Sequence, residues 1–231
     1  MKQLILPGEP PVTVRLRVSA RARRLSLRVS RLDGTVSLTL PRGVRLGEAR
    51  RFLQEREAWL RRHLAATPAP IRPMPGDEVP VAGRPHRLVV GGGRAARLGD
   101  GIITLPASAP EKTGPRVAAL LKLLARERLL QASTRHAQAL GRSFTGLTLR
   151  DTRSRWGSCS SEGRLMYSWR LVMAPPDVLD YVAAHEVAHL AHMDHSSAFW
   201  ATVERLRPDY RPHRAWLRKN GADLHAYRFH D

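Results

Sequence analysis

Cysteine is nearly absent from this 231-residue chain, which contains only Cys159. A single thiol excludes an internal disulfide and any metal site built from several cysteines. Long apolar runs are missing too: the opening segment MKQLILPGEPPV reaches Gly and Pro before a secretory signal core can form, and no later stretch is apolar over a membrane-spanning length. These absences favour a cytoplasmic protein without membrane contact.

Negative charge and lysine are both scarce. The chain has 39 Lys and Arg residues against 20 Asp and Glu, a formal net charge of +19, and nearly all of the cations are arginine. A dense cationic surface attracts polyanions, so one interpretation is contact with nucleic acid or nucleotide through an Arg-rich surface. A GC-rich coding bias gives the same composition without a partner, and no basic run interleaved with aromatics forms a stacking platform. Both interpretations stay open.

The N-terminal part of the chain is rich in predicted strands. Apolar and polar residues alternate in VTVRLRV, LSLRV and TVSLTL, and Asp33-Gly34 lies where a hairpin turn is needed, so residues 12–40 predict a β-meander. Apolar residues at helical spacing predict a helix over residues 47–65. After a Pro-rich connector at residues 67–76, the segments VPVAG, HRLVV and GIITL predict short strands.

The C-terminal part mixes helices with strands. A helix is expected over residues 113–141, and FTGLTLRDT and RLMYSWRLVM predict two strands, the second with a strongly apolar face. A further helix opens at Pro175-Pro176-Asp177 and continues to about His192. The predicted fold class is therefore α+β, with a small β-rich region over residues 1–106 followed by a compact domain over residues 107–231.

The segment His185-Glu186-Val187-Ala188-His189 lies within this last helix. Residues four apart in a helix differ by about 40° of rotation and one turn of rise, so both imidazoles project to one side and can bind a single ion. Glu186 lies about 100° round the helix, within reach of a water activated by the metal. A carboxylate in that place supplies the general base for hydrolysis.

His195 is the expected third ligand. In an unbroken helix it would lie about 15 Å along the axis from His185, so the helix must end before it. Ser196 suits the N-cap of a following helix, SAFWATVERL, which would bring His195 back to the ion. His192 and Glu204 are weaker candidates for the third ligand. Three imidazoles predict Zn²⁺ as the cofactor.

The segments SRWGSCSSEGRLMYSWRLVMAPP and YVAAHEVAHLAHMDHSSAFW resemble the YgjP-like metallopeptidases, relatives of the SprT-like zincins. The similarity extends to VSARARRLSLRV, GTVSLTLPRG and the closing WLRKNG, and so covers most of the chain. It implies a zincin-like catalytic domain acting on a protein or peptide, with metal ligands His185, His189 and His195 and general base Glu186. His192 stands where the extended metzincin pattern has Gly, which argues against that clan.

The same resemblance implies that RWGSC forms a turn between two strands near the active-site cleft. We interpret Trp156 as a core anchor and Gly157 as a position that requires a residue without a Cβ. Arg155 has two interpretations: a structural partner of a carboxylate, or a catalytic cation that clamps an anionic substrate or stabilises an oxyanion. A nucleophilic role for Cys159 is disfavoured because activated water already fills it.

Three functions are compatible with these residues. We expect a zinc metallopeptidase, with RLMYSWRLVM accepting the substrate as an added strand. The alternative is a nucleotide phosphoanhydride hydrolase that uses the same metal, although the chain lacks a Gly-rich phosphate loop and a carboxylate cluster for Mg²⁺. A non-enzymatic nucleic-acid-binding module with structural zinc is the third, and it leaves Glu186 without a task. Phosphate donors for the second function would be Arg150, Arg153, Arg155 and Arg170.

Overall fold

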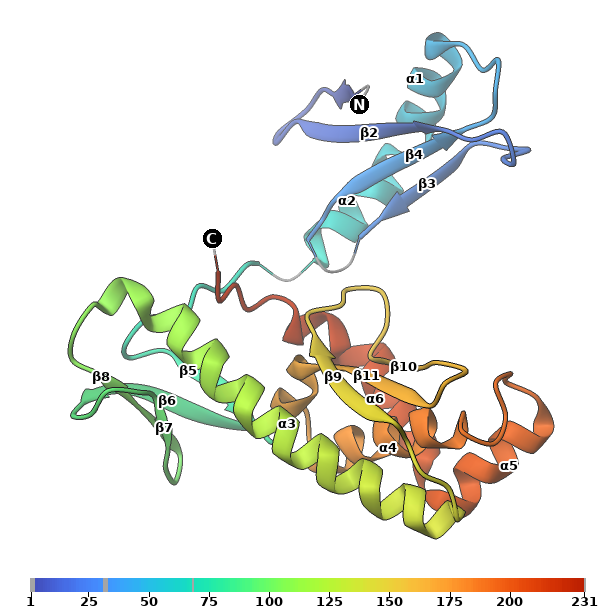
Figure 1. Ribbon diagram of the computed structural model, residues 1–231. Helices are drawn as coiled ribbons and strands as arrows, with labels where there is room; N and C mark the ends of the chain where they lie inside the picture. The colour runs from blue at the N-terminus through green and yellow to red at the C-terminus, as the bar shows by residue number, and fades with distance from the viewer. Residues whose placement is uncertain (1–2, 31–32, 68, 231) are drawn as a thin grey trace. The chain divides into compact units, whose positions relative to one another are not determined.

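A computed structural model describes residues 3–30, 33–67 and 69–230 of the chain. The chain divides into two compact units, Met1–Pro70 and Ile71–Asp231 (Figure 1). Helices and strands are present in both units, so the α+β class is confirmed.

The division after Pro70 differs from the boundary expected after residue 106. The strands between these two positions share a hydrophobic core with the C-terminal helices, because Val79, Leu88 and Ile103 are buried in the same cluster as Leu121. The sequence placed these strands with the N-terminal ones only because both segments are rich in strands. Their packing shows that they belong to the C-terminal unit.

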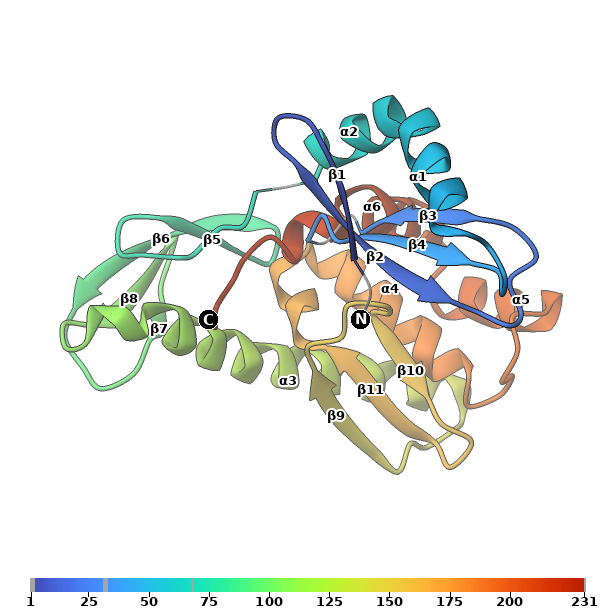
Figure 2. The same cartoon turned by 90° about the horizontal axis from the view of Figure 1, so that it is seen from above.

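The N-terminal unit is a four-stranded sheet with two helices on one face (Figure 2). Side chains on β2 alternate between buried and exposed, and the buried ones join Leu53 and Leu60 of the helices in one core. The other face of the sheet carries the exposed residues. The elements are β1 (Gln3–Leu6), β2 (Val12–Val18), β3 (Ser26–Val29), β4 (Val36–Leu40), α1 (Leu46–Glu55) and α2 (Glu57–Ala65), and the strand order is β1-β2-β4-β3.

The predicted β-meander is wrong in its strand order. The turn at Asp33-Gly34 joins β3 and β4 as an antiparallel pair, as expected, but β4 also pairs in parallel with β2 and separates it from β3. All three apolar residues of β4, Val36, Leu38 and Leu40, are buried. A strand with this burial belongs in the centre of a sheet, and the less buried β3 takes the edge.

The C-terminal unit begins with a second four-stranded sheet, of strand order β5-β6-β8-β7. Its neighbouring strands pair antiparallel, parallel and antiparallel, which is the arrangement of the first sheet. A 3-10 turn then leads into the longest helix of the described chain, which ends at Leu140 and is capped by Gly141 in the left-handed conformation, φ 66°. These elements are β5 (Glu78–Val81), β6 (Arg84–Gly91), β7 (Arg97–Leu98), β8 (Ile102–Pro106), η1 (Pro110–Lys112) and α3 (Thr113–Leu140).

A three-stranded sheet, of order β10-β11-β9, and three helices complete this unit. The predicted strand RLMYSWRLVM ends at Ser168, and its second half is a 3-10 helix in which all five residues are buried. Burial on every side removes the alternation that a strand pattern assumes. The elements are β9 (Gly146–Arg150), β10 (Gly157–Cys159), β11 (Arg164–Ser168), η2 (Trp169–Met173), α4 (Pro176–Ala188), α5 (Ser197–Leu206) and α6 (Tyr210–Leu224).

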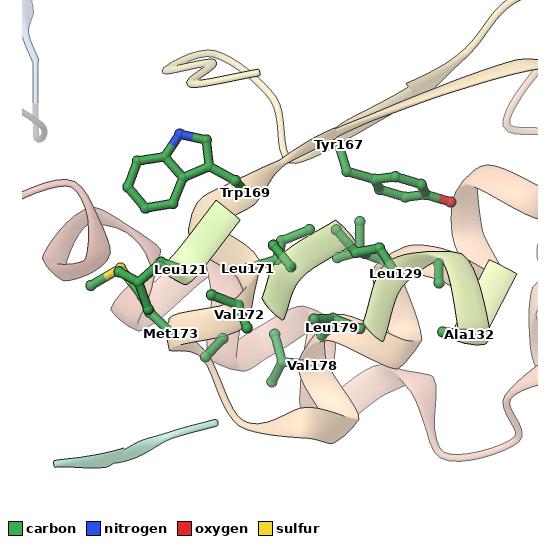
Figure 3. Close-up of a cluster of buried hydrophobic side chains, with 14 of the residues drawn as sticks. Leu121, Leu129, Ala132, Tyr167, Trp169, Leu171, Val172, Met173, Val178 and Leu179 are labelled. Carbon is green, nitrogen blue, oxygen red and sulfur yellow. The ribbon is translucent and has the colours of Figure 1, made fainter. Parts of the chain in front are cut away.

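The core of the C-terminal unit lies where α3 packs on η2 and α4. Figure 3 shows Leu121 and Leu129 of α3 beside Leu171 of η2 and Val178 of α4. Tyr167 is also buried there, and its hydroxyl lies 3.0 Å from the Ser133 hydroxyl of α3. Among the described residues, no helix has both the length and the apolar character needed to cross a membrane.

Candidate metal centre

Helix α4 positions the first residues of the site. It carries His185 and Glu186 and ends at Ala188, with His189 as its C-cap in the right-handed conformation, φ −64° and ψ −18°. The helix therefore stops earlier than the expected end near His192. The helical backbone at His189 still sends its imidazole to the side of His185, and the two ring centroids are 5.2 Å apart.

A second helix returns the chain to this side. The Ser196 hydroxyl accepts a hydrogen bond from the Phe199 amide at 3.4 Å and caps α5, which confirms the expected N-cap. Phe199 is fully buried, and its ring centroid lies 4.4 to 4.9 Å from those of all three imidazoles. Packing around Phe199 thus holds His195 against the histidines of α4.

His185, His189 and His195 form one cluster, in which one ring nitrogen from each residue lies within 4.8 Å of the others. The Nε2 atoms of His185 and His195 are 3.3 Å apart. Two imidazole nitrogens bound tetrahedrally to zinc at about 2.0–2.1 Å lie roughly 3.3–3.4 Å apart, so this pair has the separation of zinc ligands. Among the residues that the structure describes, the cluster includes neither the His192 imidazole nor Glu204.

The protonation and outer contacts of the histidines suit a cation. Burial, followed by the charges of the neighbouring imidazoles, lowers the pKa of His185 to about 3, so the ring is neutral and able to ligate. His189 Nδ1 lies 2.9 Å from the His192 carbonyl oxygen, which leaves Nε2 for an ion. His185 Nδ1 is buried without a hydrogen-bond partner in the described chain. The three imidazoles therefore fit a metal ion. Of His185 and His189, only His189 has a hydrogen-bond partner for the ring nitrogen that faces away from the ion.

Glu186 is buried beside the three histidines, on the wall of the same cavity of about 420 Å³. Burial raises the pKa of its carboxyl to about 8, while the charge of Arg155 acts in the opposite direction. A Cβ placed on Gly157 of β10 would lie 2.5 Å from Glu186 Oε1. The close approach of β10 to α4 therefore requires glycine, in agreement with the structural interpretation of this position.

The other residues of RWGSC surround this cavity. Burial raises the pKa of the Cys159 thiol to about 11, with Glu186 acting in the same direction, so the sulfur stays protonated and is a poor nucleophile. Trp156 packs against Gly221 of α6, where an added Cβ would lie 2.8 Å from the indole ring. Arg155 lines the cavity and forms no ion pair with a described residue.

Arg170 has a structural role instead of the phosphate-binding role considered from the sequence. Its guanidinium is buried and donates hydrogen bonds to both carboxylate oxygens of Asp151, at 2.6 and 3.1 Å. It also donates to the carbonyl oxygens of Leu224 and Tyr227 at 2.7 and 3.0 Å. With these partners it joins the residue after β9 to the end of α6 and the segment that follows it.

Two further residues at the site were missed from the sequence. Tyr181 lies one helical turn before His185 and lines the cavity, so its spacing was a signal that could have been used. Arg214 of α6 stacks on Trp200 at 4.5 Å, and its charge contributes to the lowered pKa of His185. Nothing in the local sequence of Arg214 connects it with the histidines.

The family model described as "YgjP-like, metallopeptidase domain" matches residues 23–220. The chain belongs to the YgjP-like family. Membership confirms the resemblance found in the sequence. The family implies a hydrolase of the metallopeptidase class that uses a metal ion and acts on a protein substrate.

This YgjP-like chain also has similarity to a solved structure, described as "Crystal structure of the metallopeptidase zymogen of Pyrococcus abyssi abylysin". The two sequences are 22% identical, the match covers 40% of this chain and 92% of that chain, and the TM-score is 0.36. No curated protein sequence matches.

Proposed function

We propose that this YgjP-like protein is a zinc peptidase, in which His185, His189 and His195 hold the metal and Glu186 is the general base. The observation that carries the proposal is the 3.3 Å separation of His185 Nε2 and His195 Nε2 beside a buried carboxylate. Three imidazole ligands leave one coordination position for substrate or water, which is the pattern of catalytic zinc sites.

When bound, zinc would supply a Lewis acid that polarises the scissile carbonyl and acidifies water. Glu186 takes a proton from the attacking water at its carboxylate and later gives that proton to the leaving amine. Gly157 holds the wall of the cavity against this carboxylate, so the base is fixed and shielded from solvent. Arg155, a cation on the same cavity with no ion-pair partner among the described residues, stabilises the oxyanion that develops on the substrate.

The substrate-binding strand is β10. The sequence favoured RLMYSWRLVM, but its strand portion, β11, lies in the middle of the sheet between β10 and β9. β10 is an edge strand, and its residues Gly157, Ser158 and Cys159 line the cavity beside the histidines. An extended peptide added to β10 is therefore held next to Glu186. We propose that the enzyme hydrolyses a protein or peptide in the cytoplasm.

Glu186→Gln tests this function. The variant is expected to keep one zinc per chain by elemental analysis and to lose hydrolysis of unfolded casein by at least about a hundredfold, because general base catalysis contributes that much. Glu204→Gln on α5 is the matched control and should retain both zinc and activity. Unchanged casein hydrolysis by Glu186→Gln, or a wild-type chain purified without zinc and unable to bind it, would refute the proposal.

A further inference from the structure

The open face of the N-terminal sheet is strongly basic. The strand residues that point away from α1 and α2 include Arg15 and Arg17 of β2 and Arg28 of β3, all exposed. Ser37 of β4 lies between Arg15 and Arg28 in one row of the sheet, because it is paired with both. In the next row Thr39 lies between Arg17 and Ser26. We call this surface the basic sheet face.

No carboxylate balances these arginines. Residues 1–70 contain 15 Lys and Arg residues but only 5 Asp and Glu, a net charge of +10, and none of the five acids is in a strand. Glu9 and Asp33 are in the connections between strands, and the others are in the helices on the opposite side. Within the described residues, Arg15, Arg17 and Arg28 form no ion pair. Their charge is therefore available to a partner.

The second sheet of the chain shows that arginine-rich composition alone does not create such a face. It has the same strand order and pairing, and its open face also carries two arginines, Arg87 and Arg97. That face differs in placing Glu78 opposite Arg87 and in including Val89 beside Thr104. A coding bias acts on both sheets alike. The first sheet differs because the described residues of its open face include three arginines and no carboxylate.

We propose that the basic sheet face binds the phosphate backbone of a nucleic acid. Guanidinium groups form bidentate hydrogen bonds with phosphate, and the Ser and Thr hydroxyls between them supply further donors. Arg15 and Arg17 are roughly 7 Å apart along the strand, and Arg15 and Arg28 roughly 10 Å apart across β4, so each can reach a separate phosphate. The face carries no aromatic side chain among its described residues, so bases are not stacked and binding is independent of sequence.

Nucleic acid suits this face better than an anionic membrane. Ile5 is its one large exposed apolar side chain among the described residues, whereas membrane-surface binding depends on a broad apolar face buried among the lipids. The proposal does not depend on the metal centre, which lies in the other unit.

The test is fluorescence anisotropy of the full-length chain with labelled single-stranded RNA, single-stranded DNA and duplex DNA of about 20 nucleotides, longer than one typical binding site. Binding should weaken with salt, and the triple variant Arg15→Gln/Arg17→Gln/Arg28→Gln should bind at least tenfold more weakly. Removing three phosphate contacts should also reduce the slope of log K against log salt by about two to three.

A matched variant separates a specific face from total charge. Arg45→Gln/Arg50→Gln/Arg51→Gln removes the same charge from exposed positions at α1 and should change affinity less than threefold. Ser37→Glu, which keeps every arginine but adds a carboxylate between Arg15 and Arg28, should also weaken binding severalfold.

Equal weakening by the two triple variants would overturn the proposal. So would binding to phosphatidylserine vesicles without binding to any of the oligonucleotides. Casein hydrolysis by the variants reports on the proposed peptidase separately.

Discussion

The two units of this chain use their charged residues in opposite ways. In the C-terminal unit, two buried charges outside the metal centre have partners: Asp180 of α4 lies 2.8 Å from Arg207 and 3.0 Å from His136, and Arg170 is held by Asp151. In the N-terminal unit, the arginines of the basic sheet face have no acidic partner in the described chain. Paired buried charges fix geometry, whereas unpaired surface charges create an attractive potential.

This difference has a consequence for substitutions. A site built from converging side chains fails when one of them is removed, because the others cannot take its place. A charged surface loses affinity in small, roughly additive steps, because each cation contributes separately. Single substitutions should therefore have large effects in the C-terminal unit and small ones in the N-terminal unit.

The largest effect is expected for His195→Ala, which removes one of three converging imidazoles. Zinc affinity, measured by competition with a chromogenic chelator, should fall by at least about a hundredfold. His192→Ala should change zinc affinity by no more than a few fold, because His189 bonds to the His192 carbonyl oxygen and alanine keeps that atom. Loss of zinc in His192→Ala or Glu204→Ala, with retention in His195→Ala, would show that the third ligand is misassigned.

The next effect concerns the buried charge that anchors α4 to its neighbours. Although burial opposes it, the hydrogen bond from His136 and the charges of His136, Arg135 and Arg207 lower the pKa of Asp180. Asp180→Asn removes the acid that His136 and Arg135 share, while Arg207 keeps its other acidic partners. The substitution should reduce the free energy of unfolding by about 2–3 kcal/mol, allowing for the exposure of Arg135. Urea denaturation measures this loss.

Glu57→Gln is the corresponding change in the N-terminal unit. Glu57 pairs with Arg61 at 2.8 Å, but both side chains are partly exposed. Its loss should cost less than about 1 kcal/mol. Equal costs for Glu57→Gln and Asp180→Asn would remove the contrast between the two units.

The sequence predicted the elements and the histidines because their signals are local. Helical spacing placed His185 and His189 on one side of α4, and the capping preference of Ser196 located the start of α5. The position of Arg214 beside the site and the pairing of β4 with β2 depend on contacts between distant segments. Neither leaves a local pattern, so neither was predicted.

The 3-10 helix at residues 169–173 shows a second limit. Its sequence alternates as a strand would, yet Arg170 is buried because Asp151 and two carbonyl oxygens satisfy its guanidinium. A hydrophobicity pattern treats arginine as an exposed residue. It cannot anticipate partners that arrive from elsewhere in the chain.

An effect between those of Asp180→Asn and Glu57→Gln is expected for Gly157→Ala. The added Cβ meets Glu186 at 2.5 Å, so α4 or β10 must shift, at a cost of about 1–3 kcal/mol in the free energy of unfolding. Zinc should remain bound, because no ligand is touched, while casein hydrolysis should fall with the displaced carboxylate. Gly47→Ala in α1 is the control: nothing lies within 4 Å of its Cβ, and stability should stay equal or rise slightly. A Gly157→Ala protein with full activity would show that the contact does not position Glu186.

The last effect is a pH dependence of stability that arises at His225, behind the site. Burial, followed by the charge of Arg170, lowers the pKa of His225 to about 4 from an ordinary value of 6.5. As the pH falls from about 6.5 to about 4, the unfolded chain binds a proton that the folded chain refuses, so stability is lost across that window. Calorimetric Tm values of wild type and His225→Gln should therefore converge as the pH falls through it, because the variant lacks this group. Loading both proteins with zinc before the scan makes the titration of the metal-binding histidines common to the pair, so that the difference in Tm reports His225 alone. A constant difference in Tm across the window would mean that the folded protein accommodates the imidazolium beside Arg170, and that the pairing of Arg170 with Asp151 leaves room for a second positive charge.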